Sequence, residues 1–143
     1  MLIKQISVFI ENRPGSLANV TEALADSKVD IIALSLADTS EFGILRLIVD
    51  KPDEAKTALR EAGLIVKSTD VLAVAMDDRP GGLAGVVRLI ADAGLSIEYM
   101  YAFVGKKDGK AVVVVRVNDL EAAMVALNKD GSTIVTARDI YNL

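Results

Sequence analysis

The sequence predicts an α+β protein built from two similar units, each with the element order β-α-β-β-α-β. The first observation behind this is a short motif that occurs at residues 11–18 and again, 66 positions later, at residues 77–84. The second is that apolar residues alternate before each copy and follow helical spacing after it. An internal repeat of this kind decides the domain organisation before any single element does. We therefore expect two domains, residues 1–68 and residues 69–143.

The first unit is predicted to contain six elements, each identified by its apolar period of two or 3.6 residues. In chain order they are a strand around Ile6, Val8 and Ile10; a helix with Leu17, Val20, Thr21 and Leu24 on one face; strands over 30–37 and 43–49; a helix with Ala55, Ala58, Leu59 and Ala62 on one face; and a short strand over 64–66. Asp50 is the expected N-cap of the second helix, Pro52 fits its first turn and Gly63 ends it.

The second unit repeats this order. Its elements are a strand with Leu72, Val74 and Met76 on one face; a helix with Leu83, Val86, Val87 and Ile90; strands over 96–104 and 111–117; a helix with Leu120, Ala123, Met124 and Leu127; and a last strand from Thr133 to Thr136. Residues 106–109 form the expected hairpin turn, which is two residues longer than in the first unit. Asn118 or Asp119 is the expected cap of the second helix.

This element order, with right-handed crossovers, gives an antiparallel four-stranded sheet with both helices on one face, a ferredoxin-like topology. Residues 31–36 and 112–115 are nearly continuous apolar runs, which are typical of strands buried on both sides. We expect the sheet of a second copy to cover the open face. Residues 67–70 form a connector of hairpin length, so the last strand of the first unit can pair with the first strand of the second. In that arrangement the segment near Ile134 returns to pair with residues 6–10.

Composition excludes several classes of function. The formal net charge of −4 argues against nucleic acid, which clustered Lys and Arg would bind. The chain contains neither Cys nor His, so it lacks a thiolate nucleophile and the commonest general base and metal ligand. No apolar run is long enough to span a membrane, and the first residues enter a strand at once. We expect a cytoplasmic protein with no cofactor, no metal and no catalytic site.

The two repeats resemble the ACT domain, a family of small-molecule regulatory modules. The likeness covers essentially the whole chain as two tandem copies. It rests on Asn12-Arg13-Pro14-Gly15, followed by Leu17-Ala18, and on Asp78-Arg79-Pro80-Gly81, followed by Leu83-Ala84. The second strands also begin alike, with residues 29–31 matching residues 95–97. The resemblance implies binding of a free amino acid between paired domains, often joined edge to edge into one eight-stranded sheet, to control an enzyme or a transcription factor.

In the family, the ligand lies between the first loop of one domain and the start of the second strand of its neighbour. Carried over to this sequence, the resemblance points to the following residues: Asn12, Arg13, Gly15, Ser16, Leu17, Asp30, Ile31, Asp78, Arg79, Gly81, Gly82, Leu83, Ser96 and Ile97. The chemistry agrees, since each helix start offers N–H donors for a carboxylate and Asn12, Asp30 and Asp78 offer acceptors for an ammonium group. The glycines at 15, 81 and 82 would let a ligand approach the backbone.

The two predicted sites differ in charge. If loops and strand starts pair across the units, one site combines Asn12 with Ser96, and the other combines Asp78 with Asp30. Two carboxylates attract a cation but repel each other when the site is empty. We therefore expect two inequivalent sites.

The leading hypothesis is a non-catalytic amino-acid sensor that acts through a partner or through its own assembly as a homodimer. The alternative is an oligomerisation or regulatory subunit of an amino-acid metabolic enzyme, without a ligand of its own; the small regulatory subunits of acetolactate synthase carry a similar first segment. An enzyme on the same topology is disfavoured because His and Cys are absent. Simpler roles stay open for Asp30, as a strand-start residue, and for Tyr99, Tyr101 and Phe103, as packing or oligomer contacts.

Overall fold

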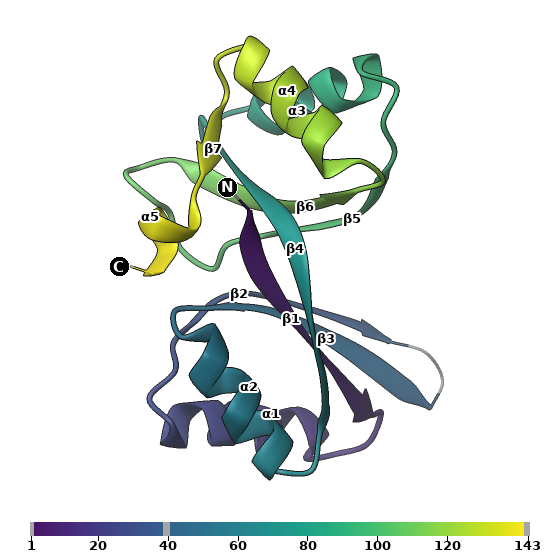
Figure 1. Ribbon diagram of the computed structural model, residues 1–143, viewed down its shortest axis with the longest axis vertical. Coiled ribbons are helices and arrows are strands. Elements are labelled where there is room, and N and C mark those ends of the chain that lie inside the picture. Colours follow the sequence, from purple (N-terminus) through teal and green to yellow (C-terminus); the bar gives the residue numbers. More distant parts are fainter. Residues whose placement is uncertain (1, 39–40, 142–143) are drawn as a thin grey trace. The chain divides into compact units, whose positions relative to one another are not determined.

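The computed structural model describes residues 2–38 and 41–141 and places them in two compact units, in which each sheet carries helices on one side (Figure 1). The first unit comprises Lys4–Asp70 together with Tyr141. The second unit comprises Val71–Ile140 together with Leu2 and Ile3. The predicted α+β class and the ferredoxin-like tandem arrangement are confirmed.

The first unit follows the predicted order of elements. They are β1 (Ile3–Glu11), α1 (Ser16–Asp26), β2 (Ile31–Asp38), β3 (Phe42–Val49), α2 (Pro52–Glu61) and the first part of β4 (Ile65–Met76). Strand β3 pairs antiparallel with β1 on one side and with β2 on the other. Its first residue lies opposite Glu11, and its last lies opposite Ile31.

The apolar stripes predicted for the first unit form its core. Ile6, Val8 and Ile10 of β1 are buried together with Val20 and Leu24 of α1 and Ala55 and Leu59 of α2. The alternating face of the strand thus meets the 3.6-residue stripe of each helix, as amphipathic elements require. Figure 1 shows both helices on the same side of this unit's sheet.

The second unit repeats the arrangement. Its elements are the second part of β4, α3 (Gly82–Asp92), β5 (Ile97–Ala102), β6 (Ala111–Val117), α4 (Leu120–Lys129), β7 (Thr133–Val135) and a short C-terminal helix, α5 (Ala137–Tyr141), which the sequence did not predict. Its core contains Leu72 and Val74 of β4, Ile90 of α3, and Ala123 and Leu127 of α4. The hairpin between β5 and β6 turns through Asp108 and Gly109, both with positive φ, as a two-residue turn of this kind requires.

Two expectations about the sheet are wrong. Residues 67–70 are not a hairpin connector but lie within β4. The last strand of the first unit and the first strand of the second are therefore one strand, and the described residues form seven strands and not the expected eight. The sequence Lys67-Ser68-Thr69-Asp70 contains no Gly or Pro to turn the chain, and its polar side chains do not interrupt the strand. Strand β7 pairs with β4, with Ile134 opposite Val74, and not with residues 6–10. The exchange of terminal strands between the units therefore does not occur.

The sheet face away from the helices carries apolar residues, as predicted, but in the first unit it also carries Ser7 and Ser35 opposite Arg46. It carries Ala33 and Ile48 in the first unit, and Tyr101 and Val114, which lie opposite each other, in the second. That a second copy covers this face stays a prediction.

The continuity of β4 predicts strong sensitivity to proline at its centre. The N–H groups of neighbouring residues in a strand point to opposite edges of that strand. At least one of the two variants Ser68→Pro and Thr69→Pro therefore removes a hydrogen bond between strands. We expect that variant to lower the free energy of unfolding by about 3 kcal/mol, the scale of other interior prolines. Urea unfolding followed by circular dichroism measures it. Wild-type stability in both variants would indicate a turn at residues 67–70.

Candidate functional site

The two predicted strand-to-helix turns have the same backbone geometry. Gly15 precedes α1 and Gly81 precedes α3, each with a φ of 90°, in the left-handed region that glycine adopts without strain. In neither helix does a side chain cap the N-terminus. The N–H groups of Ser16 and Gly82, the first residues of the two helices, donate to the carbonyl oxygens of Arg13 and Arg79, at 3.3 and 3.0 Å. The following N–H groups of each first turn, together with the positive end of the helix dipole, are therefore the ones available to an anion.

The first loop forms one wall of a cavity of about 270 Å³, close to the lower end of the usual range for small-molecule sites. The cavity is lined by Ile10, Glu11, Asn12, Arg13, Ser16, Leu17, Leu36 and Gly43. The Arg13 guanidinium lies 3.0 Å from the Glu11 carboxylate, so a cation and an anion stand side by side at its edge. Four predicted residues, Asn12, Arg13, Ser16 and Leu17, are thus brought together here.

The second loop is held differently, by lysines of the β5–β6 hairpin. Lys106 Nζ lies 2.6 Å from an Asp78 carboxylate oxygen, and Lys110 Nζ lies 2.8 Å from one of Asp77. Arg79 also pairs with Asp77, at 3.4 Å. The carboxylate of Asp78, predicted to accept a ligand ammonium group, therefore already contacts an ammonium group of the protein. We call this pair of lysine contacts the lysine latch.

The latch affects the ionisation of Asp77. The hydrogen bond from Lys110 and the positive charge of that lysine, followed by the same effects of Arg79, lower the pKa of the Asp77 carboxyl group. Asp77 therefore stays ionised to a lower pH than a free aspartate does.

The predicted strand-start residues lie at the other end of each unit's sheet. The backbone N–H of Asp30 donates to the Asp50 carboxylate at 2.8 Å, and that of Ser96 donates to the Asn118 side chain at 3.0 Å. In the first unit, the loop end of β3 is Phe42 and the Asp30 end is Val49, about 24 Å away at strand spacing. No unit therefore brings its own loop and its own strand start together.

The two expected caps have separate roles. Asp119 caps α4 by accepting a hydrogen bond from the Ala122 N–H at 3.1 Å. Asp50 does not cap α2, whose N-cap is Lys51 without a side-chain hydrogen bond. Asp50 and Asn118 instead hold the starts of β2 and β5. This role was not predicted, although both residues directly follow the third strand of their unit at equivalent positions.

Sequence reasoning also missed the charged residues that surround the loops. Glu11, Asp77, Lys106 and Lys110 did not enter the predicted site, because residues 106–109 were interpreted only as a hairpin turn. The available signal was the acidic first residue of each motif, together with Lys106 in the longer turn and Lys110 directly after it. Their pairing depends on strand register, which the sequence alone did not supply.

Gly82 is required by the loop itself. A Cβ atom at this position would lie 2.2 Å from the carbonyl oxygen of Asp77, far inside van der Waals contact. At the equivalent position the first unit carries Ser16, so the two loops differ in how closely their backbones pack. The expected approach of a ligand at Gly82 stays a prediction.

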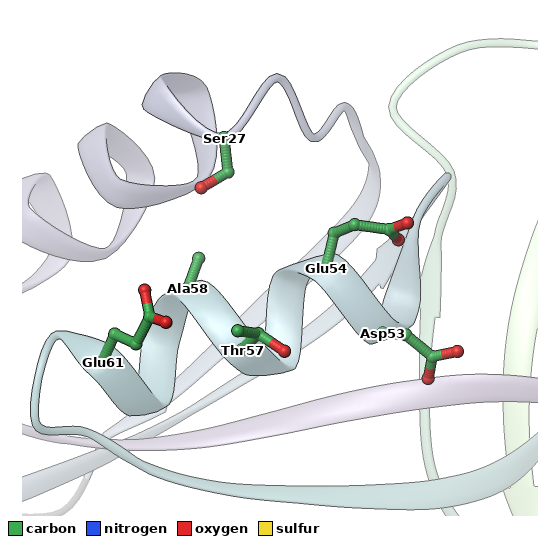
Figure 2. Close-up of a pocket in the computed structure, with 6 residues that line it drawn as sticks. All are labelled: Ser27, Asp53, Glu54, Thr57, Ala58 and Glu61. Atoms are coloured by element: carbon green, nitrogen blue, oxygen red, sulfur yellow. The ribbon is translucent and has the colours of Figure 1, made fainter.

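A hollow of about 460 Å³ lies outside the predicted site, between the end of α1 and the outer face of α2 (Figure 2). Figure 2 shows Asp53, Glu54 and Glu61 around it, together with Ser27 and Thr57. Within residues 2–38 and 41–141, no group of three or more acidic side chains is arranged to hold a metal ion. Over the same ranges, no helix is long and apolar enough to cross a membrane.

A family model described as an ACT domain pair matches residues 1–143. The crystal structure of protein BT0572 from Bacteroides thetaiotaomicron is similar, with 37% identity, coverage of 100% of this chain and 98% of that chain, and a TM-score of 0.92. The ligand-free regulatory subunit of aspartate kinase from Thermus thermophilus shares the fold, with 20% identity, coverage of 90% and 93%, and a TM-score of 0.65. The corresponding Thermus flavus subunit has 22% identity, coverage of 88% and 90%, and a TM-score of 0.57. No match was found among curated proteins.

The close backbone packing at Gly82 predicts a difference between equivalent substitutions. Gly82→Ala should lower the free energy of unfolding by about 1–3 kcal/mol, the usual effect of overpacking, because its methyl group meets a backbone oxygen. Ser16→Ala removes only a hydroxyl group and should change stability by less than about 0.5 kcal/mol. Chemical denaturation of both variants makes the comparison. Equal effects would contradict the difference between the loops.

The lowered pKa of Asp77 predicts a pH-dependent effect of Lys110→Gln. A carboxyl group with a lowered folded-state pKa stabilises the fold fully above its unfolded pKa of about 3.9, and loses this effect as pH falls through the folded value. The wild type should therefore exceed Lys110→Gln in stability by a constant amount from pH 7 to about pH 5. The difference should shrink below about pH 4, as measured by urea unfolding at low salt. A difference that does not change down to pH 2 would contradict the pairing.

Proposed function

Since the chain belongs to the ACT domain family as a tandem pair, we propose that it is a non-catalytic regulatory protein that binds a free amino acid. The family is regulatory rather than catalytic, which supports this class of function. The observation that carries the proposal is the cavity at the first loop, where Arg13, Asn12 and the uncapped start of α1 come together.

The cavity offers groups for both charges of an amino acid. The Arg13 guanidinium and the first-turn N–H groups suit the ligand carboxylate, since a guanidinium binds carboxylates through two parallel hydrogen bonds. The Glu11 carboxylate and the Asn12 side-chain oxygen suit the ligand ammonium group. Glu11 and Arg13 are paired at 3.0 Å, so a zwitterion can replace one ion pair by two without adding net charge.

The remaining predicted residues would come from another ACT unit. Asp30 and Ser96, with Ile31 and Ile97 beside them, lie at the far end of their own sheets from the loops. The proposed ligand therefore lies between the loop of one ACT unit and the second-strand start of another. We propose a homodimer as the working assembly.

The two loops are proposed to differ in affinity. At the second loop the lysine latch already supplies ammonium groups to Asp77 and Asp78, and a ligand ammonium group would have to displace Lys106. The first loop has no equivalent lysine in the described residues, since the position of Lys110 is occupied there by Phe42. We propose that the first loop binds the ligand more tightly.

The proposed output is control of an enzyme of amino-acid metabolism. The two Thermus proteins that share the fold are regulatory subunits of such an enzyme, aspartate kinase. Ligand binding would change the affinity for the partner only as far as the ligand distinguishes the bound from the unbound assembly.

The test is a thermal-shift screen of the purified chain against the twenty amino acids and several nucleotides. A ligand at ~100 times its Kd should add about 2.7 kcal/mol of stability, which raises the melting temperature clearly. Calorimetric titration of the hits should then show that Asn12→Ala weakens the tight site about tenfold or more, the effect of losing a ligand hydrogen bond. Asp78→Ala should leave the tight site nearly unchanged.

Lys106→Ala serves as the matched variant, because it removes the lysine-latch contact to Asp78 without changing the first loop. It should strengthen binding at the second loop and leave the tight site as it is. Equal affinity at both loops in the wild type would contradict the proposed inequivalence. A flat response to the whole panel would instead favour the alternative, a subunit that oligomerises or regulates without a ligand.

A further inference from the structure

A second groove, of about 340 Å³, lies on the other side of the first loop and is mainly apolar. Three of its large apolar residues are unusually exposed: Phe9 at 38%, Phe42 at 55% and Ile65 at 68%. Exposed apolar side chains that gather around one groove indicate a binding surface more strongly than scattered ones do. The groove is lined by Phe9, Ile10, Glu11, Arg13, Ser16, Asn19, Phe42, Ala62, Gly63, Leu64 and Ile65.

Strand register gathers these residues. Phe42, the first residue of β3, lies directly opposite Glu11 at the end of β1. Phe9 precedes Glu11 by two residues and so points to the same face of the sheet. Ile65 is the first residue of β4 and completes the apolar wall. The charged pair of Glu11 and Arg13 closes the same groove, so its apolar and charged parts are adjacent.

The second unit has the equivalent groove with different chemistry. Its volume is about 460 Å³, and the positions of Phe9, Phe42 and Ile65 are taken by Ala75, Lys110 and Thr133. Lys110 there pairs with Asp77 across the strands, at the register position where Phe42 lies opposite Glu11. The two equivalent grooves thus differ because one has an apolar wall and the other is lined by an ion pair.

We propose that the first-unit groove holds the side chain of an amino acid ligand, and that the ligand is one with a large apolar side chain. This inference rests on the proposed function and narrows the class of ligand. Glu11, Arg13 and Ser16 line both the groove and the loop cavity, so the loop can bind the α-ammonium and α-carboxylate groups while the side chain extends along Phe9, Phe42 and Ile65. Burying such a side chain against three apolar residues favours it over a small or charged one.

Charge complementarity favours an amino acid over a second copy of the chain as the occupant. The groove ends at one acidic and one basic side chain 3.0 Å apart, which matches the two charged groups of a zwitterion. Its volume is that of a small-molecule site. An interface between copies would need a much wider apolar surface.

The experiment is calorimetric titration of the full chain with two sets of amino acids. Phenylalanine, leucine, isoleucine and methionine form the apolar set, and glycine, serine, aspartate and lysine form the small or charged set. We expect at least one member of the apolar set to bind at least about tenfold more tightly than every member of the other set. Phe42→Lys combined with Ile65→Thr gives the groove the second unit's residues at two of its three apolar positions. This double variant should weaken the apolar ligand about tenfold or more.

The control is Val125→Thr, which makes the same kind of change at a side chain of α4 that is 65% exposed and lies in the other unit. It should leave affinity unchanged. Light scattering on each variant reports the oligomeric state. All of the substituted side chains are more than half exposed, so loss of the fold is not expected.

The outcomes separate this inference from the proposed function. Tight binding of a small or charged amino acid that Phe42→Lys with Ile65→Thr does not alter overturns the inference and leaves the sensor function standing. Dissociation of an oligomer by the double variant, with ligand affinity unchanged, also overturns it and assigns the groove to an interface. Failure of every amino acid to bind overturns both.

Discussion

The structure depends on a backbone constraint at the point where a strand turns directly into a helix. The turn needs a residue with positive φ before the helix, and Gly15 and Gly81 provide it with the same φ of 90°. Any other residue there would be strained, because a Cβ atom disfavours the left-handed region. The same turn leaves α1 and α3 without a side-chain cap. One conformational requirement thus fixes the path of the chain and leaves the electropositive start of each helix without a side-chain cap.

At the opposite end of each sheet, a side chain after the third strand accepts a hydrogen bond from the start of the second strand. The two units use different residues for this same contact. Asp50 accepts a hydrogen bond from the Asp30 N–H, and Asn118 accepts one from the Ser96 N–H. A backbone hydrogen bond also runs in the opposite direction in both units. The Asp50 N–H donates to the Asp30 carbonyl oxygen at 3.2 Å, and the Asn118 N–H donates to that of Ser96 at 3.3 Å. A carboxylate and an amide both supply an oxygen acceptor, so the identity of the residue matters less than that oxygen. This explains why the repeat survives in geometry where the sequence has diverged.

Local patterns were sufficient to predict the two cores, the turns and every element except α5 and the middle of β4, because each of these is determined by residues close together in the chain. The period of Ile6, Val8 and Ile10 is one example, and the Asp108-Gly109 turn is another. Residues 67–70 were misjudged because a short polar segment has the same composition in a connector and in an exposed strand. The lysine latch and the apolar groove depend on which residue lies opposite which, as Phe42 does to Glu11. Register between distant strands is a tertiary property, so the sequence pattern predicted the loops without predicting their surroundings.

The difference between the units comes down to a few side chains on a retained backbone. An acidic residue stands at the end of the first strand of each unit: Glu11 is the last residue of β1, and Asp77 directly follows β4. The residue across from it decides its environment. In the second unit this residue is Lys110, which forms an ion pair with Asp77. In the first unit it is Phe42, which adds an apolar wall to the groove, and Glu11 pairs with Arg13. Exposed ion pairs are weak in water, so this exchange costs the fold little while it changes the groove from charged to apolar. Duplication of a rigid turn followed by substitution at a register position is therefore a physically simple way to obtain two unlike grooves from one fold.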